Sequence, residues 1–275
     1  TLFRSVISTN DVLKKIRKNA NSFIDESAYI RARLFDMVLG DWDRHEDQWR
    51  WAAFNENNKT IYRPIPRDRD QVFSIMADGA LLNYITKSVP ALRLMQSYEE
   101  EMGNTKWFNL EPYPLDMAII TEAQKTTWDA EVSYIQKNLT AQIIDKALSH
   151  FPSEINDQTT IDIKRKLKGR IRNLQKISNE YFKYMNNFAV IIGTDKDDYF
   201  EIERLANGTT QVSGYRIKKG KKEDLIHQKK YNSNNTKEIW IYGLDDKDEF
   251  KVFGEYSKGS FVRIIGGQNN DVYNI

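Results

Sequence analysis

The sequence has no cysteine, and this absence removes several chemistries at once. Without thiols the 275-residue chain has no disulfide, no thiolate-bound metal and no cysteine nucleophile. It also lacks an apolar run near the ~20 residues that a membrane-spanning helix needs. Neither sign of charge dominates, because 41 Lys and Arg stand against 39 Asp and Glu, a formal net charge of +2. We therefore expect no transmembrane segment and no specific nucleic-acid partner.

What is present is material for a folded core. The chain is 40% hydrophobic and 12% aromatic, and its length suits one large domain or two ordinary ones. It starts at Thr1, with neither a Met nor a signal-like segment. We therefore interpret it as a fragment of a larger protein, and we expect other domains of that parent chain among its partners.

Apolar spacing predicts a mainly helical domain over residues 1–185. Thr9 and Asn10 are expected to cap a first helix, and Asp25 a stronger one over 26–39 that Gly40 ends. In that stronger helix Ala28, Ala32, Phe35 and Leu39 have the spacing of one buried face. Strands over 49–54 and 60–65 form a predicted hairpin. Further helices are expected over 92–102, after a capping box at Thr121-Glu-Ala-Gln124, from Thr140, and along 160–184.

After Asn187 the apolar period changes from helical to strand-like, which predicts an all-β module over residues 186–275 and an α+β fold class overall. Asn207-Gly208 predicts a hairpin turn. One pattern occurs three times: a glycine, an aspartate five residues later and an aromatic residue two beyond that. Its copies are Gly193-Asp198-Phe200, Gly243-Asp248-Phe250 and Gly266-Asp271-Tyr273. The repeat predicts stacked β-coils or a small β-sandwich.

Two acidic loops flank the predicted hairpin at the same end. The first loop carries Asp41, Asp43, Arg44, His45 and Gln48, and the second carries Arg67, Asp68, Arg69 and Asp70. Carboxylates at this density repel one another unless arginines or a divalent cation compensate them. Oxygen-only ligand sets suit Mg²⁺, which keeps several waters and binds substrate phosphates. Two interpretations stay open: a phosphate-and-metal site, or a salt-bridge lattice that only fixes the loops.

Asp43-Arg-His-Glu-Asp-Gln48, followed by a hairpin and a second acidic loop, resembles the catalytic loop of atypical kinases. Phosphoinositide kinases, HipA toxin kinases, secretory-pathway kinases and spore-coat CotH kinases use variants of it. The resemblance covers roughly residues 26–73 and implies a kinase-like C-terminal lobe. It implies that Asp43 is the catalytic aspartate, with Arg44 and His45 bracing the loop. It implies further that Gln48 with Asp68 or Asp70 binds Mg²⁺ or Mn²⁺, with ATP as the phosphate donor.

The sequence departs from that pattern in three places. Gln48 stands where asparagine is usual, and no Phe-Gly follows Asp68 or Asp70. The 25 or so residues before the helix over 26–39 contain no Gly-rich loop and no strand lysine. We therefore expect the chain to be a divalent-metal and phosphate-binding lobe of a phosphotransferase that acts on a phosphate-containing small molecule. The alternative is a non-catalytic structural or interaction module derived from such a lobe.

Two resemblances concern the β module. With its Ile264-to-Asp271 ending, the whole chain is similar to segments of large bacterial envelope proteins that carry a phosphoesterase domain elsewhere, which implies the periplasm or cell envelope. The three turns loosely resemble the Ca²⁺-binding repeat of haemolysin-like β-rolls, which implies Ca²⁺ at the Asp248 and Asp271 turns. The unequal spacing of 50 and then 23 residues favours a purely structural repeat instead.

Other charged residues receive plain interpretations. We expect the basic stretch over residues 164–176 to be a solvated helix face. His150 and His227 have no partners at metal-ligand spacing, so they are expected to be ordinary surface residues.

Overall fold

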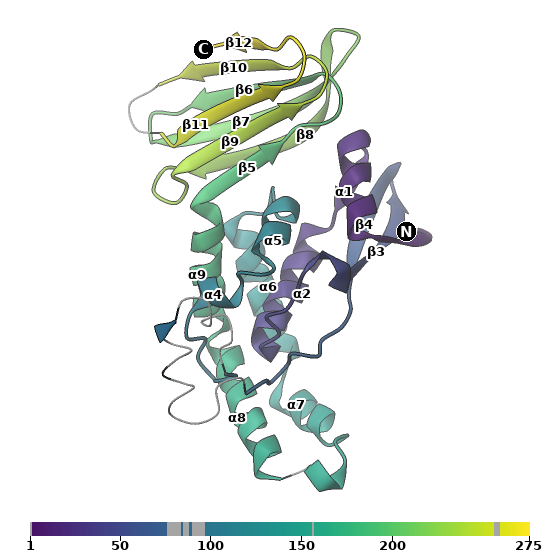
Figure 1. Ribbon diagram of the computed structural model, residues 1–275, viewed down its shortest axis with the longest axis vertical. Helices are drawn as coiled ribbons and strands as arrows, with labels where there is room; N and C mark the ends of the chain where they lie inside the picture. The colour runs from purple at the N-terminus through teal and green to yellow at the C-terminus, as the bar shows by residue number, and fades with distance from the viewer. Residues whose placement is uncertain (1, 76–83, 85–87, 90–96, 156, 256–258) are drawn as a thin grey trace.

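The computed structural model describes residues 2–75, 84, 88–89, 97–155, 157–255 and 259–275. Helices dominate the described residues up to 186, and two β-sheets follow them (Figure 1). The predicted α+β class is therefore confirmed. None of the helices among the described residues is both long enough and apolar enough to cross a bilayer.

Helix α2 (Glu26–Leu39) lies at the centre of the helical part (Figure 1), and its predicted ends are confirmed. The Asp25 carboxylate accepts a hydrogen bond from the Ala28 amide, and Gly40 ends the helix at φ +81°. A Cβ at Gly40 would lie 2.5 Å from the Tyr98 ring, so both conformation and space require glycine there. Of the predicted buried face, Ala32, Phe35 and Leu39 pack against the core but are only partly buried, and the most deeply buried face lies beside them. The residues that are fully buried include Ile30, Arg33, Leu34, Asp36, Met37 and Val38.

The predicted hairpin is confirmed as β3 (Trp49–Glu56) and β4 (Lys59–Pro66), and Asn57 and Asn58 at its tip have positive φ. The hairpin belongs to a larger sheet of order β1-β3-β4-β2, which adds β1 (Leu2–Ser8) and β2 (Ser22–Ile24). The sequence interpretation missed these two strands because β1 is mostly exposed and β2 has three residues.

Helix α1 (Thr9–Lys18) follows β1, and its cap differs from the prediction. Ser8 caps it, since the Ser8 hydroxyl accepts from the Asp11 amide at 3.2 Å. Thr9 is instead used for packing: its hydroxyl donates to the Glu46 carbonyl at 2.8 Å and accepts from the Trp51 indole at 3.1 Å.

Three other helix predictions need correction. The expected helix over 160–184 is two helices, α8 (Gln158–Arg172) and α9 (Leu174–Asn186), which meet at Asn173. Thr121 does not start a helix, because the Glu26 carboxylate accepts from the amides of residues 121–123 and α6 begins at Lys125. Residues 97–102 of the helix predicted over 92–102 are not helical, and residues 92–96 lie outside the described residues.

The remaining elements complete the helical part. Thr140 caps α7 (Ala141–Leu148), as predicted. The others are α4 (Thr105–Phe108), α5 (Tyr113–Ile119), α6 (Lys125–Asn138) and the 3₁₀ turns η1 (Glu46–Gln48) and η3 (Ser153–Ile155). Buried side chains from Val12 to Met185 form one hydrophobic core.

The β module forms two sheets, of order β12-β10-β6-β7-β8 and β11-β9-β5. The strand pairs β5/β6, β9/β10 and β11/β12 are three successive coils, paired parallel to one another. The strands are β5 (Phe188–Ile192), β6 (Asp198–Arg204), β7 (Thr209–Lys218), β8 (Lys221–Asn232), β9 (Glu238–Leu244), β10 (Glu249–Gly254), β11 (Phe261–Gly267) and β12 (Val272–Asn274). The β7–β8 hairpin is inserted after the first coil, and this insertion explains the spacing of 50 and then 23 residues.

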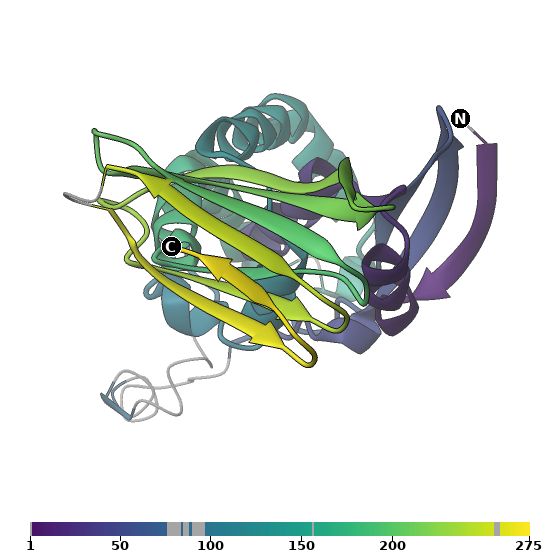
Figure 2. The same ribbon diagram turned by 90° about the horizontal axis from the view of Figure 1, so that it is seen from above.

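The β module has its own core, made by residues from Ala189 to Phe250. Seen from above, it covers the helices, while β1 and the β3–β4 hairpin lie to one side (Figure 2). Helix α9 leads directly into β5, and Asn207 and Gly208 form the predicted β6–β7 turn with Gly208 at φ +75°.

Candidate functional site

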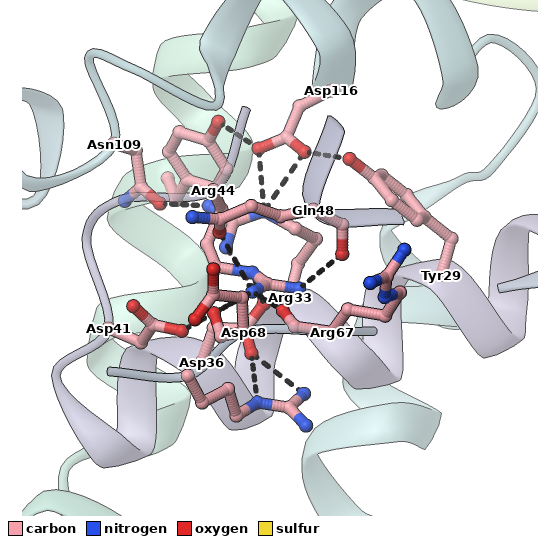
Figure 3. Close-up of polar contacts among 12 residues, drawn as sticks. Tyr29, Arg33, Asp36, Asp41, Arg44, Gln48, Arg67, Asp68, Asn109 and Asp116 are labelled. Carbon is pink, nitrogen blue, oxygen red and sulfur yellow. Dashed lines mark hydrogen bonds and ion pairs between the residues drawn. The ribbon is translucent and has the colours of Figure 1, made fainter. Parts of the chain in front are cut away.

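Three arginines and three aspartates, all buried except the half-buried Arg69, form a lattice at the base of the two acidic loops, and Figure 3 shows most of it. Asp36 is its centre, because Arg33, Arg44 and Arg69 all reach its carboxylate, at 3.2, 3.2 and 2.8 Å. The six residues of the lattice are Arg33, Asp36, Asp41, Arg44, Arg69 and Asp116. Their formal charges balance, which the cost of burying charge requires.

One end of the lattice ties helices together. Arg33 Nε donates to Asp116 at 3.0 Å, and the hydroxyls of Tyr29 and Tyr181 donate to the same carboxylate at 2.7 and 2.5 Å. Arg33 Nη2 also donates to the Asn109 amide oxygen at 2.7 Å. Burial and the charge of Asp116 hold the pKa of both tyrosines well above the usual value. The polar groups of these side chains hydrogen-bond to one another and join α2, α5 and α9. We therefore assign a structural role to this end of the lattice.

The other end joins the two acidic loops through Arg44. Its Nη1 donates to the Gln48 side-chain oxygen at 3.0 Å and to the carbonyls of Arg67 and Asp68 at 2.5 and 2.9 Å. The guanidinium also lies over the Trp49 ring, 4.6 Å from its centre. Asp68 has φ +51°, so the second loop is bent sharply where Arg44 holds it. The buried Arg44 side chain thus fixes the two loops against each other, together with a hydrogen bond from the Arg67 amide to the Gln48 carbonyl at 2.8 Å.

Asp41 lies inside the lattice and faces no solvent. Neither carboxylate oxygen has a hydrogen-bond partner among the described residues, and the nearest cation, Arg44 Nη1, is 3.5 Å away. Burial and the neighbouring Asp36 raise the pKa of Asp41 to about 7. Asp41 is therefore a lattice residue, and it is separate from the carboxylates that face outward.

Asp43, Asp68 and Asp70 are placed differently. Asp68 and Asp70 are exposed and Asp43 is half-buried. In the described part of the chain none of the three forms an ion pair, because the guanidinium groups are directed to Asp36, Asp41 and Asp116. The closest polar contact of Asp43 is the Gln48 amide nitrogen, at 3.5 Å. The sequence left open whether the carboxylates are paired with arginines or available to a cation. The loops contain both: Asp41 lies in the arginine lattice, and Asp43, Asp68 and Asp70 lie outside it.

Three of the predicted site residues, His45, Gln48 and Asp68, line a shallow hollow of about 370 Å³, which Asp43, Arg44 and Asp70 do not border. It is bordered by His45, Asp47, Gln48, Arg67 and Asp68. His45 is half-buried at the start of η1. The Gln48 oxygen faces Arg44 and its amide nitrogen faces Asp43, so Gln48 links the two in this conformation.

The described residues contain no group of three or more His, Cys, Asp or Glu that could hold a metal ion by itself. A cation here would need ligands from water or phosphate, as Mg²⁺ commonly does.

The Asp248 and Asp271 turns, where Ca²⁺ was expected, are closely packed. Asp248 is fully buried, and its Oδ1 accepts from the Asp198 amide at 2.9 Å. The Asp248 amide in turn donates to Asp271 Oδ1 at 3.0 Å. These carboxylates accept hydrogen bonds from the backbone of the neighbouring coil. Ca²⁺ binding at these turns stays a prediction.

Sequence reasoning named Asp41, Arg44 and Arg69 of the lattice but missed Arg33, Asp36 and Asp116. The available signal was that Arg33 and Asp36 stand three residues apart among the apolar residues of the second half of α2. His227, expected at the surface, is buried: its Nδ1 contacts the Glu122 carboxylate and its Nε2 lies 3.2 Å from the Tyr231 hydroxyl. The basic stretch over 164–176 is only partly solvated, since Arg170 is buried and donates to the carbonyls of Glu99 and Met37.

Comparisons of the chain with protein-family models, with curated proteins and with solved structures gave no match.

Proposed function

We propose that residues 26–73 form the divalent-metal and phosphate-binding part of a kinase-like phosphotransferase lobe. One observation supports this most directly. The arginines neutralise Asp36, Asp41 and Asp116 and hold the backbone of Asp68, but they leave the carboxylates of Asp43, Asp68 and Asp70 unpaired among the described residues. A lattice that only fixed the loops would have no need of three further carboxylates beside it.

The roles follow from position and from the resemblance to atypical kinases. Asp43 would orient the acceptor hydroxyl or take its proton. Arg44 would position the loops, and Asp68 or Asp70 would hold Mg²⁺ or Mn²⁺ against phosphate oxygens. When bound, the ion would neutralise phosphate charge, and one or two protein carboxylates suffice for that. The sequence offers no Gly-rich phosphate loop, so we propose that another domain of the parent chain contributes to ATP binding.

The second candidate is a non-catalytic module of a bacterial envelope protein, derived from such a lobe. The completely satisfied contacts around Asp116 favour it, as does the lack, among the described residues, of a self-sufficient metal-ligand group. In that case the outward carboxylates are a solvated surface, and the parent's other domains are the partners.

Calorimetric titration with Mn²⁺, alone and with ATP or pyrophosphate, separates the two candidates. We expect saturable binding above the protein-free blank, weakened at least about tenfold, or 1.4 kcal/mol, in Asp43→Asn and Asp70→Asn. Glu46→Gln is the matched control, because Glu46 is exposed on the same loop and does not border the hollow. All three variants should keep the wild-type thermal midpoint. Absence of binding by the wild-type chain under every condition would support the non-catalytic module.

A further inference from the structure

The three coils of the β module are held together by one contact pattern that repeats. In the parallel pairs, Glu249 lies opposite both Tyr199 and Val272, so the three repeat aspartates are neighbours. The Asp198 amide donates to Asp248 Oδ1, and the Asp248 amide donates to Asp271 Oδ1, at 2.9 and 3.0 Å. Asp248, in the middle coil, therefore accepts a hydrogen bond from the coil before it, and its amide donates one to the coil after it.

The other two repeat positions serve the same stacking. Phe200, Phe250 and Tyr273 form a column of rings whose centres are 5.4 and 5.3 Å apart, with interplanar angles of 6° and 15°. A Cβ on Gly193, Gly243 or Gly266 would lie 2.8, 2.0 or 1.9 Å from the aspartate carboxylate of its own coil. The repeated glycine, aspartate and aromatic residue thus provide the contacts by which one coil stacks on the next.

The first coil is closed off by the inserted hairpin. The Asp198 carboxylate accepts from the Thr194 amide and hydroxyl, at 2.5 and 2.9 Å, and Arg216 of β7 lies 3.7 Å away. On this side β6 pairs with β7, and β8 contacts the helical part through the Gln228 amide and Glu122. No further coil is accommodated there.

The last coil is open. β12 is the edge of the five-stranded sheet and β11 the edge of the three-stranded sheet, on the same side of the stack (Figure 1). Phe261 on β11 and Tyr273 on β12 are 57% and 48% exposed. The Asp271 amide has no hydrogen-bond acceptor among the described residues, although the equivalent amides of Asp198 and Asp248 both have one. Among the described residues, this face of the stack therefore presents an unused amide donor, an exposed ring and two strand edges.

We propose that this open end binds a further strand–turn–strand segment carrying the same Gly-x-x-x-x-Asp-x-aromatic pattern, in parallel register. Its two strands would pair with β11 and β12, its aspartate would accept from the Asp271 amide, and its aromatic ring would stack on Tyr273. Exposed sheet edges are templates for strand addition, and the side-chain column adds specificity. A second copy of this chain fits less well, because two open ends facing each other both present the amide donor and neither presents the carboxylate.

The test uses the whole chain and a labelled peptide with the sequence of residues 261–275, which carries the pattern once. We expect saturable binding by fluorescence anisotropy, and at least tenfold slower hydrogen exchange at the Asp271 amide when the peptide is bound. A peptide with alanine in place of its aspartate should bind at least tenfold more weakly. Phe261→Lys in the protein, which places a charge on the β11 edge, should weaken binding similarly without changing the thermal midpoint.

Three outcomes would overturn the proposal. The first is no binding up to 1 mM peptide, and the second is equal binding of a scrambled peptide. The third is sedimentation showing that the chain alone forms dimers that protect the Asp271 amide, which would assign the edge to a second copy. None of these outcomes bears on metal binding at the acidic loops.

Discussion

Only one of the two carboxylate oxygens of Asp248 receives a hydrogen bond from the described residues. Its Oδ1 accepts from the Asp198 amide, but Oδ2 has no hydrogen-bond partner among the described residues. A Cβ on Gly243 would meet both this Oδ2 and the Gly266 carbonyl oxygen, so two acceptors border the same small space. Burial, with the charges of Asp198 and Asp271, raises the pKa of Asp248 to about 7. A protonated carboxyl can donate there and a carboxylate cannot.

We predict that Asp248→Asn stabilises the protein at pH 8 by about 1–3 kcal/mol, the cost of one unsatisfied buried group. The folded pKa of Asp248 lies above the unfolded value of about 3.9, so the folded state binds more protons between these values. Stability of the wild-type protein should therefore fall as pH rises from about 4 to about 7, and the variant should show a flatter profile. Urea unfolding at several pH values measures this.

Asp245→Asn is the control for this prediction, because Asp245 is exposed on the same turn. An equal gain in stability for the control would attribute the effect to net charge. A loss of stability in Asp248→Asn at pH 8 would show that the buried charge is favourable.

At the scale of elements, Arg44 decides the shape of the candidate site. Local signals place α2, the hairpin and the two loops, but no local signal fixes the loops against each other. Arg44 does so through Gln48 and the carbonyls of Arg67 and Asp68, while it also neutralises Asp36 and Asp41. A buried charge that loses its partner is costly, so the lattice and the loops depend on the same guanidinium.

We predict that Arg44→Ala lowers the free energy of unfolding by about 3–5 kcal/mol, because it leaves buried carboxylates without their cation. Hydrogen exchange should also speed up at the amides of both loops. Arg67→Ala is the matched control: Arg67 is exposed, its side chain has no ion pair in the described part of the chain, and the change should stay within about 0.5 kcal/mol. Similar losses for both variants, measured by urea unfolding, would contradict the role given to Arg44.

For the whole molecule, a polar network joins the two cores. Glu122, in the segment before α6, contacts His227 Nδ1 and accepts from the Gln228 amide of β8 at 3.2 Å. The neighbouring Lys229 is buried, and burial lowers its pKa against the opposing charges of Glu26 and Glu122. The half-exposed Glu122 thus interacts across the interface with the buried His227, the Gln228 amide and the charge of the buried Lys229.

We predict that Glu122→Ala uncouples the two cores. Differential scanning calorimetry should then show two transitions where the wild-type protein shows one, because the contact that transmits cooperativity is lost. The pKa of Lys229 should fall further, since one of its two compensating charges is removed. Glu111→Ala, at an exposed position, is the control and should leave a single transition. A single transition in Glu122→Ala would show that α9 and β5 couple the cores without this network.

The sequence by itself determined the features that depend on neighbours along the chain. These are the ends of α2 at Asp25 and Gly40, the β3–β4 and β6–β7 turns, and the repeated glycine-aspartate-aromatic pattern. Caps and turns are satisfied within a few residues, so their signals are local. The convergence of the two loops also followed from their place at one end of the hairpin.

Only the tertiary structure decided which carboxylates are neutralised, because the arginines and aspartates of the lattice come from positions up to 83 residues apart. It likewise decided that Glu26 caps residues 121–123, nearly a hundred positions away, and that β7 and β8 are inserted within an otherwise regular stack. Burial and charge pairing depend on distance in space, and spacing in the sequence does not report that distance.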